Sequence, residues 1–332
     1  MAFPLPALTF ARMADVSPAG VLISDLLDAV FTSWSAGTDY RGTALPSTHL
    51  WGVTRKRPTV VTEAVVALPP AGTPMGLSPA ILVAGRTANA GTMAAPDTSV
   101  ASALQVGINK NSGAYADWSA ASPMTSGQFF GYWRGGPTAM NAAGTIVRSY
   151  ISAESIFTQI ITSAAVQSWF YVGAIASPYN NDATNNAESD NRLYGMVASG
   201  GTSSVNASWL NLTTAAAFLN HATSAGGHHC GVFQPGTASL YPGGRRCLWG
   251  TAAVADSLID SAGWYDGEAV EIGKSLGTNN NSGNRLGVIR GLFLAGSVQS
   301  GRYLRNGATD LYHYVSMNTG AAADGMMLPA VP

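Results

Sequence analysis

Charge is what this sequence has least of. Asp, Glu, Lys and Arg together make up 11% of its 332 residues, whereas an ordinary soluble domain has about a quarter. Lysine is the scarcest of the four, since only Lys56, Lys110 and Lys274 are present. The formal net charge of −1 argues against bulk attraction to nucleic acid or to anionic lipid. A folded chain this poor in charge is expected to cover much of its surface with other subunits.

Long hydrophobic runs, a secretory leader and a cysteine framework are also missing. No apolar run approaches the roughly 20 residues that span a bilayer, and the first residues lack the basic start and apolar run of a signal peptide. We therefore expect synthesis in a cytoplasm and no membrane partner. The two cysteines, Cys230 and Cys247, are expected to be free thiols there. A disulfide between them, formed after release from the cell, remains an alternative.

A helix is predicted after an irregular N-terminal segment. Residues 2–10 hold two prolines and no periodic pattern, which is typical of an extended arm. Ser17 is suited to cap the helix, Pro18 to fill its first position, and Gly37 to end it. Apolar residues then recur at spacings of three and four, at Leu22, Ile23, Leu26, Leu27, Val30, Phe31 and Trp34. We expect this face to pack on the protein's own core, with a neighbouring subunit as the alternative.

The rest of the chain is typical of a mainly β protein. Short segments rich in β-branched and aromatic residues alternate with Gly, Pro, Asn and Ser clusters. They cover residues 58–68, 82–84, 146–150, 156–162, 166–175, 192–197, 229–233, 246–249, 269–272, 286–294 and 311–317. This pattern predicts an antiparallel β-sandwich or barrel-like domain with an N-terminal arm and one amphipathic helix.

Two divisions of the chain are expected. The arm and helix occupy residues 1–50 and the β-rich domain residues 51–332, with a further split near residue 120 as an alternative. A second, short helix is predicted over residues 213–221, where Thr213 is suited to cap an alanine-rich run.

Two motifs resemble catalytic or metal sites, but their spacing does not support them. The run from Gly273 to Gly277 matches the pattern of a nucleophile elbow, yet the residues after it do not predict the helix that such an elbow needs. His221, His229 and Cys247 form the best combination of zinc ligands, but they fit no standard finger. We expect no catalytic residues, no cofactor and no metal.

Carboxylates are few, and one group lies in an Asn-rich loop over residues 179–191. Asp182, Glu188 and Asp190 there suggest calcium binding, or the acid of a glycosidase, as alternatives to a self-bonded loop. The basic runs at residues 55–57 and 245–246 flank strands and are expected at solvated or interface positions.

Aromatic residues cluster at residues 118–133 and 169–171. Trp and Tyr supply rigid contact area at interfaces and in sugar sites. We expect most of these side chains in the core, and any exposed ones would suit a glycan on a host surface.

The chain resembles the structural proteins of tailed-bacteriophage virions. The resemblance lies in residues 290–294 (RGLFL), in residues 324–329 (DGMMLP) and in the central run over residues 146–175. It implies a β-rich, charge-poor protein that is made in the host cytoplasm and built into a symmetric particle, with no catalytic residues. The longer charged helical region of major capsid proteins is not seen, which favours a tail, baseplate, collar or decoration protein.

We therefore expect a non-enzymatic structural subunit of a virion, which assembles as a homo-oligomer and contacts other virion proteins. The candidate interface residues lie in the arm and in a proline-rich loop over residues 69–79. They are Phe3, Leu5, Leu8, Phe10, Pro69, Pro74, Met75 and Leu77. One alternative is a β-sandwich module that binds host glycan. The other is a polysaccharide-degrading virion enzyme with Glu188 or Asp190 as its acid.

Overall fold

The computed structural model describes the N-terminal part of the chain almost continuously and the later part mainly as strands. The described ranges are 8–59, 62–70, 79–86, 103–110, 143–162, 167–176, 193–199, 205–211, 218–220, 230–235, 245–247, 269–274, 284–295, 303–306, 309–316 and 325–331.

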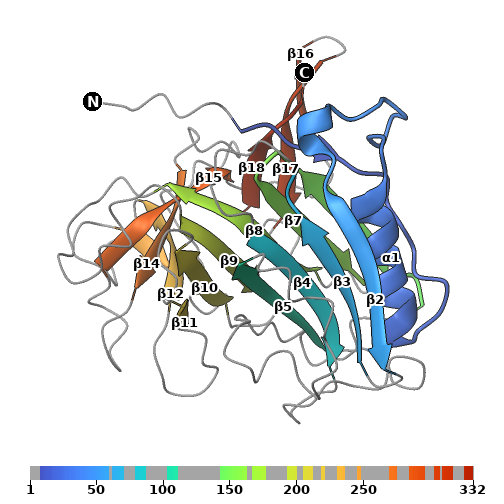
Figure 1. Ribbon diagram of the computed structural model, residues 1–332. Coiled ribbons are helices and arrows are strands. Elements are labelled where there is room, and N and C mark those ends of the chain that lie inside the picture. Colours follow the sequence, from blue (N-terminus) through green and yellow to red (C-terminus); the bar gives the residue numbers. More distant parts are fainter. Residues whose placement is uncertain are drawn as a thin grey trace.

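One α-helix, one short 3-10 helix and eighteen strands make up the described chain (Figure 1). In order they are β1 (Ala11–Arg12), α1 (Ile23–Ser35), η1 (Ser47–His49), β2 (Gly52–Thr59), β3 (Thr62–Leu68), β4 (Pro79–Arg86), β5 (Ala103–Lys110), β6 (Ile146–Ile151), β7 (Ser155–Ile161), β8 (Gln167–Ala176), β9 (Leu193–Ser199), β10 (Val205–Asn211), β11 (Phe218–Asn220), β12 (Cys230–Pro235), β13 (Arg245–Cys247), β14 (Ala269–Lys274), β15 (Asn284–Ala295), β16 (Tyr303–Asn306), β17 (Thr309–Ser316) and β18 (Gly325–Pro329).

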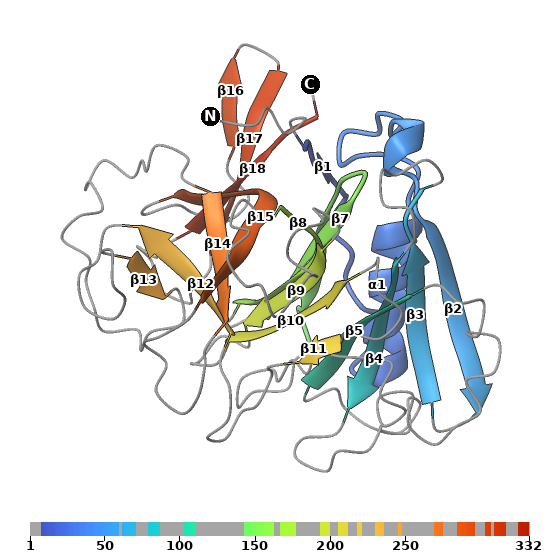
Figure 2. The ribbon, with the colours of Figure 1, turned by 60° about the vertical axis from the view of Figure 1, so that its left-hand side comes forward.

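These strands form two sheets in which every strand pair is antiparallel. The small sheet has the order β2-β3-β4-β5. The large sheet runs β1-β6-β7-β8-β15-β14-β12-β13, with β9 to β11 branching from β8 and β16 to β18 from β15. The prediction of a mainly β, antiparallel fold with one amphipathic helix is confirmed, while the described strands do not close into a barrel. β16 and β17 project at one end of the molecule (Figures 1 and 2).

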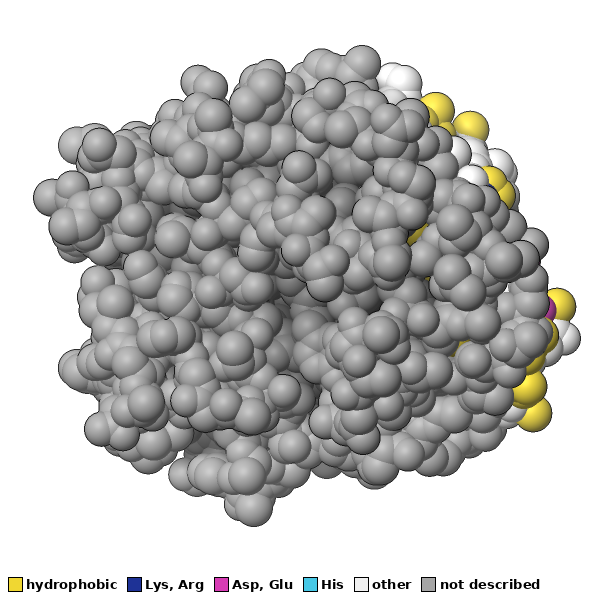
Figure 3. Space-filling view, turned by 60° about the horizontal axis from the view of Figure 1, so that its bottom comes forward, with side chains coloured by type: hydrophobic (Ala, Val, Ile, Leu, Met, Phe, Trp, Pro, Cys, Tyr) yellow, Lys and Arg dark blue, Asp and Glu magenta, His cyan; other side chains and the backbone are white. Residues whose placement is uncertain are grey.

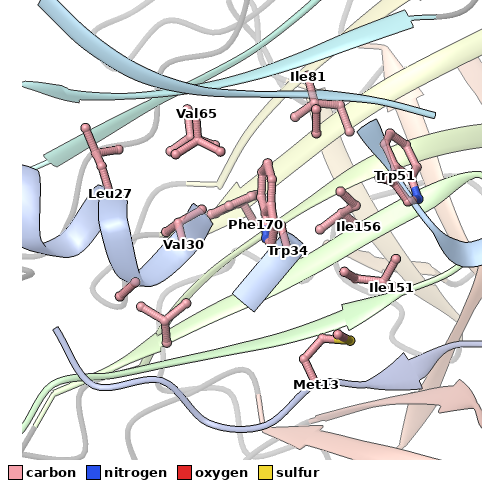
Figure 4. Packing of buried hydrophobic residues seen from close by; sticks show 14 of the residues in the cluster. Met13, Leu27, Val30, Trp34, Trp51, Val65, Ile81, Ile151, Ile156 and Phe170 are labelled. Carbon is pink, nitrogen blue, oxygen red and sulfur yellow. The ribbon is translucent and has the colours of Figure 1, made fainter. Parts of the chain in front are cut away.

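Helix α1 packs between the two sheets, as its apolar face predicts. Its exposed stripe is polar, at Asp28, Thr32 and Ser35. Figure 4 shows side chains of the helix lying between the small sheet and strands β6 to β8. The shared aliphatic core contains Ile23, Leu26, Leu27, Val30 and Trp34 of the helix, Val65, Ala67, Ile81 and Val83 of the small sheet, and Val147, Ile151, Ile156, Ile160, Phe170 and Val172 of the large sheet. The segment before residue 50 therefore shares one core with the strands that follow it.

The predicted helix start at Ser17 and Pro18 is wrong, because α1 begins at Ile23. Val16 exchanges two backbone hydrogen bonds with Val147 of β6, which holds the chain extended up to the residue before Ser17. The cap comes from inside the helix instead, since Asp25 Oδ2 accepts the Leu22 N–H at 2.9 Å. Gly37 does follow the helix closely, since α1 ends at Ser35.

Two strand-level predictions need correction. Residues 58–68 do not form one strand, because β2 and β3 turn back on each other with Thr59 paired to Thr62. The helix predicted over residues 213–221 is wrong where the chain is described, because β11 lies there and pairs with β10.

Candidate assembly site: the N-terminal strap

Residues 8–16, which we call the N-terminal strap, lie between two other segments of the sheet. On one side the Phe10 N–H donates to the Pro329 carbonyl at 2.6 Å, and the Phe10 carbonyl accepts the Val331 N–H at 3.1 Å. On the other side the strap pairs with β6, where Ala11 faces Ile151. The strap therefore joins the C-terminal segment to β6, and the link to the C-terminal segment is a parallel bridge between Phe10 and Ala330.

Four apolar side chains of the strap, Leu8, Phe10, Ala11 and Met13, are buried within their own chain. Phe10 and Met13 are fully buried and Leu8 is 9% exposed. Two of the predicted interface residues, Leu8 and Phe10, thus pack inside the single chain rather than standing free on an arm. Pro69 of the proline-rich loop is buried as well. The other predicted interface residues, Phe3, Leu5, Pro74, Met75 and Leu77, lie outside the described residues.

Gly291 makes room for the Phe10 ring. A Cβ built on Gly291 would lie 2.7 Å from Phe10 Cε2, and the residue has a φ of +76°, which L side chains rarely adopt. Gly291 also lies where β15 changes neighbours, because Val288 and Ile289 pair with β8 while Phe293 to Ala295 pair with β18. The segment 290–294, on which the resemblance to virion proteins partly rests, therefore lies within one bent strand, with the strap at its bend.

An ion pair anchors the end of the strap to β6. The Asp15 carboxylate accepts two hydrogen bonds from the Arg148 guanidinium, at 2.8 and 2.6 Å. Arg12 of the strap adds a longer contact to Asp15 at 3.5 Å. Burial opposes ionisation of Asp15, but the hydrogen bond and charge of Arg148, together with the charge of Arg12, outweigh it and lower the pKa of Asp15. A two-pronged pair of this kind fixes orientation as well as distance.

A tight turn after α1 covers the strap from outside. Asp39 Oδ1 accepts the N–H groups of Arg41 and Thr43, at 2.9 and 2.8 Å, and Gly42 takes a φ of +84°. The turn places the Tyr40 N–H on the Arg12 carbonyl at 2.9 Å. The Tyr40 ring also contacts the guanidinium carbons of Arg12 and Arg41, 4.8 and 5.1 Å from its centroid.

His49 of η1 holds the first residues of the strap. Its Nε2 lies 3.0 Å from the Thr9 carbonyl, to which it donates, and its Nδ1 lies 3.1 Å from the Thr48 hydroxyl. Burial lowers the pKa of His49, and the hydrogen bond to Thr9 only partly opposes that shift. The imidazole is therefore neutral at pH 7. Four parts of the chain thus hold the strap: the C-terminal segment, β6, the Asp39 turn and η1.

Of the three candidate zinc ligands, only Cys247 lies in a described strand. Cys247 in β13 pairs with Phe233, whereas Cys230 in β12 pairs with Lys274. Cys230 lies three positions before Phe233, the partner of Cys247, which corresponds to about 10 Å along β12. This distance exceeds the Cα separation of a disulfide. His221 and His229 lie outside the described residues. Within the described part of the chain, no group of three or more His, Cys, Asp or Glu could hold a metal ion.

The other predicted features are placed only in part. Gly273 and Lys274 end β14, and the remainder of that glycine-serine motif lies outside the described residues, as do Asp182, Glu188 and Asp190. The second aromatic cluster is confirmed as core, because Trp169, Phe170 and Tyr171 are at most 1% exposed. The first cluster lies outside the described residues.

Sequence reasoning placed residues 2–10 in an arm and missed the strap. Residues 8–16 are too few and too irregular to show a strand period, and their partners are more than 130 positions away along the chain. The sequence feature that points most directly to the strap is the short apolar run around Phe10, which the sequence alone predicts to be a surface for neighbouring subunits.

No family model, no curated protein and no solved structure matches this chain. Among the described residues, α1 is too short and too polar to span a lipid bilayer.

Proposed function

We propose that this chain is a non-enzymatic structural subunit of a bacteriophage particle, of the tail, baseplate, collar or decoration type, which assembles by self-association. The observation that carries the proposal is the shortage of charge on its surface. Among the exposed residues whose side chains are described, only Asp15, Asp28 and Arg41 are charged, and the others are mostly Gly, Ala, Ser and Thr. Figure 3 shows one edge of this surface, where hydrophobic and uncharged side chains predominate.

The two exposed carboxylates of the described residues, Asp15 and Asp28, are already paired with arginines of the same chain. Asp15 is paired with Arg148, and Asp28 accepts a hydrogen bond from Arg55 Nε at 3.0 Å. Covering this surface with another subunit therefore strips water from few unpaired ions, and that is the step that makes burial of charged surfaces costly. At roughly 25 cal/mol per Å², about 1,000 Å² of apolar contact corresponds to about 25 kcal/mol before the entropy of association is subtracted.

One edge of the small sheet is protected against indiscriminate pairing. β2 pairs only with β3 in the described chain, and it contains Arg55, Lys56, Arg57 and Pro58. Charged residues and proline on an edge strand oppose pairing with another sheet. Arg55 also donates to the Ser24 carbonyl of α1 at 3.0 Å. This arrangement is what a subunit needs if it is to associate through chosen surfaces and not through any open strand.

The proposal includes a sandwich arrangement of the two sheets. It is supported by the core that the small sheet and strands β6 to β8 share with α1. β-Sandwiches of this kind suit repeated use in a symmetric assembly, because their rigid faces present the same surface in every copy.

The test is the size of the purified chain as its concentration changes. Sedimentation velocity from about 1 µM to about 100 µM should show growth of a discrete larger species, because association follows mass action. The association constant should change little between about 0.05 and 0.5 M NaCl, since screening acts on charges and few of the described exposed residues are charged. Electron micrographs of the larger species should show closed particles of one size.

A chain that stays monomeric at the highest concentration would overturn the proposal. Binding of such a monomer to a glycan array would instead favour the host-glycan module. Loss of the larger species at high salt would also count against it, since it would mean that charge pairs hold the copies together.

A further inference from the structure

We propose that the N-terminal strap is exchanged between copies, so that residues 8–16 of one chain occupy the slot between β6 and residues 329–331 of the next chain. The proposal rests on the self-association argued above and names the contact that directs it. It follows from how completely the slot encloses the strap.

Both edges of the slot are backbone, so the strap is held as an inserted strand. Phe10 bonds the C-terminal segment, while the Met13 N–H donates to the Ser149 carbonyl at 2.9 Å and Val16 exchanges bonds with Val147 of β6 at 3.0 and 2.8 Å. Such pairing specifies direction and register, because a shift of one residue would turn every side chain to the other face. Two further contacts require the same register. They are the packing of the Phe10 ring against Gly291 and the ion pair between Asp15 and Arg148.

Among the residues whose exposure the structure describes, the exposed ones offer few contacts of comparable specificity. Small uncharged side chains favour burial but do not select one orientation of the partner, whereas the strap has hydrogen bonds, an ion pair and an aromatic ring that select one. The strap contacts can therefore define a single orientation of one copy relative to the next.

Exchange retains every one of these contacts. When an identical segment of a second chain enters the slot, the hydrogen bonds, the buried rings and the ion pair are the same as in the single chain. The equilibrium between the single chain and the exchanged form then depends on the connection between strap and helix and on protein concentration. Residues 17–21 make that connection, and each of them is exposed or half-exposed, so it can straighten without uncovering core.

Pro18 and Gly20 give this connection the character of a hinge. Pro18 favours an extended chain at the residue before it, and a Cβ on Gly20 would lie 2.5 Å from the Asp25 carboxylate that caps α1. Gly20 therefore packs closely against the helix cap, which fixes the end of the connection next to α1. Head-to-tail exchange gives a ring where the rotation between copies closes and an open filament where it does not, whereas reciprocal exchange gives a two-fold pair.

The experiment is to trap the strap in its slot with an engineered disulfide. Ala11→Cys and Ile151→Cys are made together in a Cys230→Ala, Cys247→Ala background, because residues 11 and 151 face each other in the register. Their backbones are about 5.5 Å apart in a pair of this type, which suits a disulfide. The chain is assembled under reducing conditions, then oxidised, denatured and run on a non-reducing gel.

The expected result is a ladder of covalently linked chains from the assembled fraction and a single-chain band from the monomeric fraction. A matched control places cysteines at Ile146 and Ile161, which face each other in the β6–β7 hairpin. That pair must link within one chain in both fractions. If the first variant does not fold, as judged by circular dichroism, the Val16 and Val147 bridge provides a second pair for the same test.

A second arm oxidises the dilute monomer before assembly. The link between residues 11 and 151 should then lock the strap in its own chain and abolish association, while the control link leaves association unchanged. Assembled particles that give only single-chain bands would overturn strap exchange and leave self-association standing. A chain that never associates, in any variant, would overturn both.

Discussion

Strands β6, β7 and β8 are buried on both faces, and the two faces treat their polar groups differently. On the aliphatic face, toward α1, the Trp34 indole N–H donates to the Thr158 hydroxyl at 2.9 Å, and Ser149 lies 3.1 Å from the same oxygen. The polar groups that these strands place in that core are thus bonded to one another. A small hydroxyl network of this type joins helix to sheet at a defined position.

The opposite, aromatic face is built from stacked rings. Phe157 stacks on Trp169 with centroids 5.6 Å apart, and Tyr150 meets both Phe157 and His313 of β17. Tyr171 and Ser155 share a hydrogen bond of 2.8 Å. The Tyr150 hydroxyl and the Trp169 indole N–H, however, are buried without a well-formed hydrogen bond to any described residue. Burial, opposed in part by the nearby charge of Arg148, raises the pKa of Tyr150.

The comparison shows that stacked rings are the main contacts of the aromatic face, whereas hydrogen bonds join helix to sheet on the aliphatic face. Aromatic rings add stacking energy beyond their buried area, which offsets the cost of leaving two polar atoms without partners. On the aliphatic face there is one edge-to-face ring contact, between Trp34 and Phe170 with centroids 6.0 Å apart, and the polar atoms of Trp34, Ser149 and Thr158 are hydrogen-bonded to one another. Removing a bonded polar atom, such as the Trp34 indole N–H, should therefore cost more than removing the Tyr150 hydroxyl or the Trp169 indole N–H.

The largest effect is expected where the aromatic face meets the strap. Gly291→Ala forces a Cβ against the Phe10 ring and strains a left-handed residue, which should lower the free energy of unfolding by about 3 kcal/mol. Gly42→Ala is the matched control, since Gly42 has a φ of +84° but no atom within 4 Å of the added Cβ. It should cost about 1 kcal/mol. Equal losses in urea unfolding would show that the Phe10 contact carries no strain.

A pair of tryptophan substitutions compares the two faces directly. Trp34→Phe and Trp169→Phe each remove the same atoms from a buried site, but only Trp34 loses a hydrogen bond. Trp34→Phe should cost about 3 kcal/mol and Trp169→Phe about 2 kcal/mol. Chemical denaturation of both variants measures the difference, and a larger loss at residue 169 would reverse the assignment of the faces.

Tyrosine substitutions refine the comparison within the aromatic face. Tyr171→Phe removes the bond to Ser155 and should lower the free energy of unfolding by about 1 kcal/mol. Tyr150→Phe removes a hydroxyl that lacks a well-formed bond, so it should be neutral or slightly stabilising. Thermal unfolding of the two proteins side by side is sufficient. A loss at Tyr150 as large as at Tyr171 would mean that its hydroxyl is bonded after all.

The smallest effect is expected in the acid dependence of stability at Asp15, on the aromatic side. Asp15 has a lowered pKa in the folded chain, so its contribution is fully present above the unfolded value of 3.8 and is lost as pH falls below it. Asp15→Asn should therefore flatten the fall of stability below pH 4, as followed by fluorescence. An unaltered acid profile in the Asp15 variant would count against this link.

Local patterns predicted the parts of the fold that depend on neighbouring residues. The spacing of three and four along Leu26, Val30 and Trp34 identified the buried face of α1, because one helical turn places those residues together. Most strands were recognised from β-branched and aromatic runs. Residues 58–68 were read as one strand because no Gly, Pro or Asn marks the turn between Thr59 and Thr62.

The strap was beyond such reasoning because its structure is imposed from far along the chain. Phe10 is paired with Ala330 and Arg12 with Tyr150, and no local pattern indicates either partner. The same long-range pairing explains why α1 does not begin after Ser17, where the sequence predicts its cap. The burial of Trp169 and Tyr171, in contrast, followed the ordinary expectation for aromatic residues.

The bridge between Phe10 and Ala330 has a consequence for synthesis on the ribosome. Phe10 emerges 320 residues before Ala330, a delay of roughly 15 to 60 s at ordinary rates of translation. Strand β6 is made about 140 residues after the strap, and from then until Ala330 is made the nascent chain has only one of the two neighbours of its first strand. Finished molecules nearby, and chains growing on the same messenger, meet it in that half-paired form.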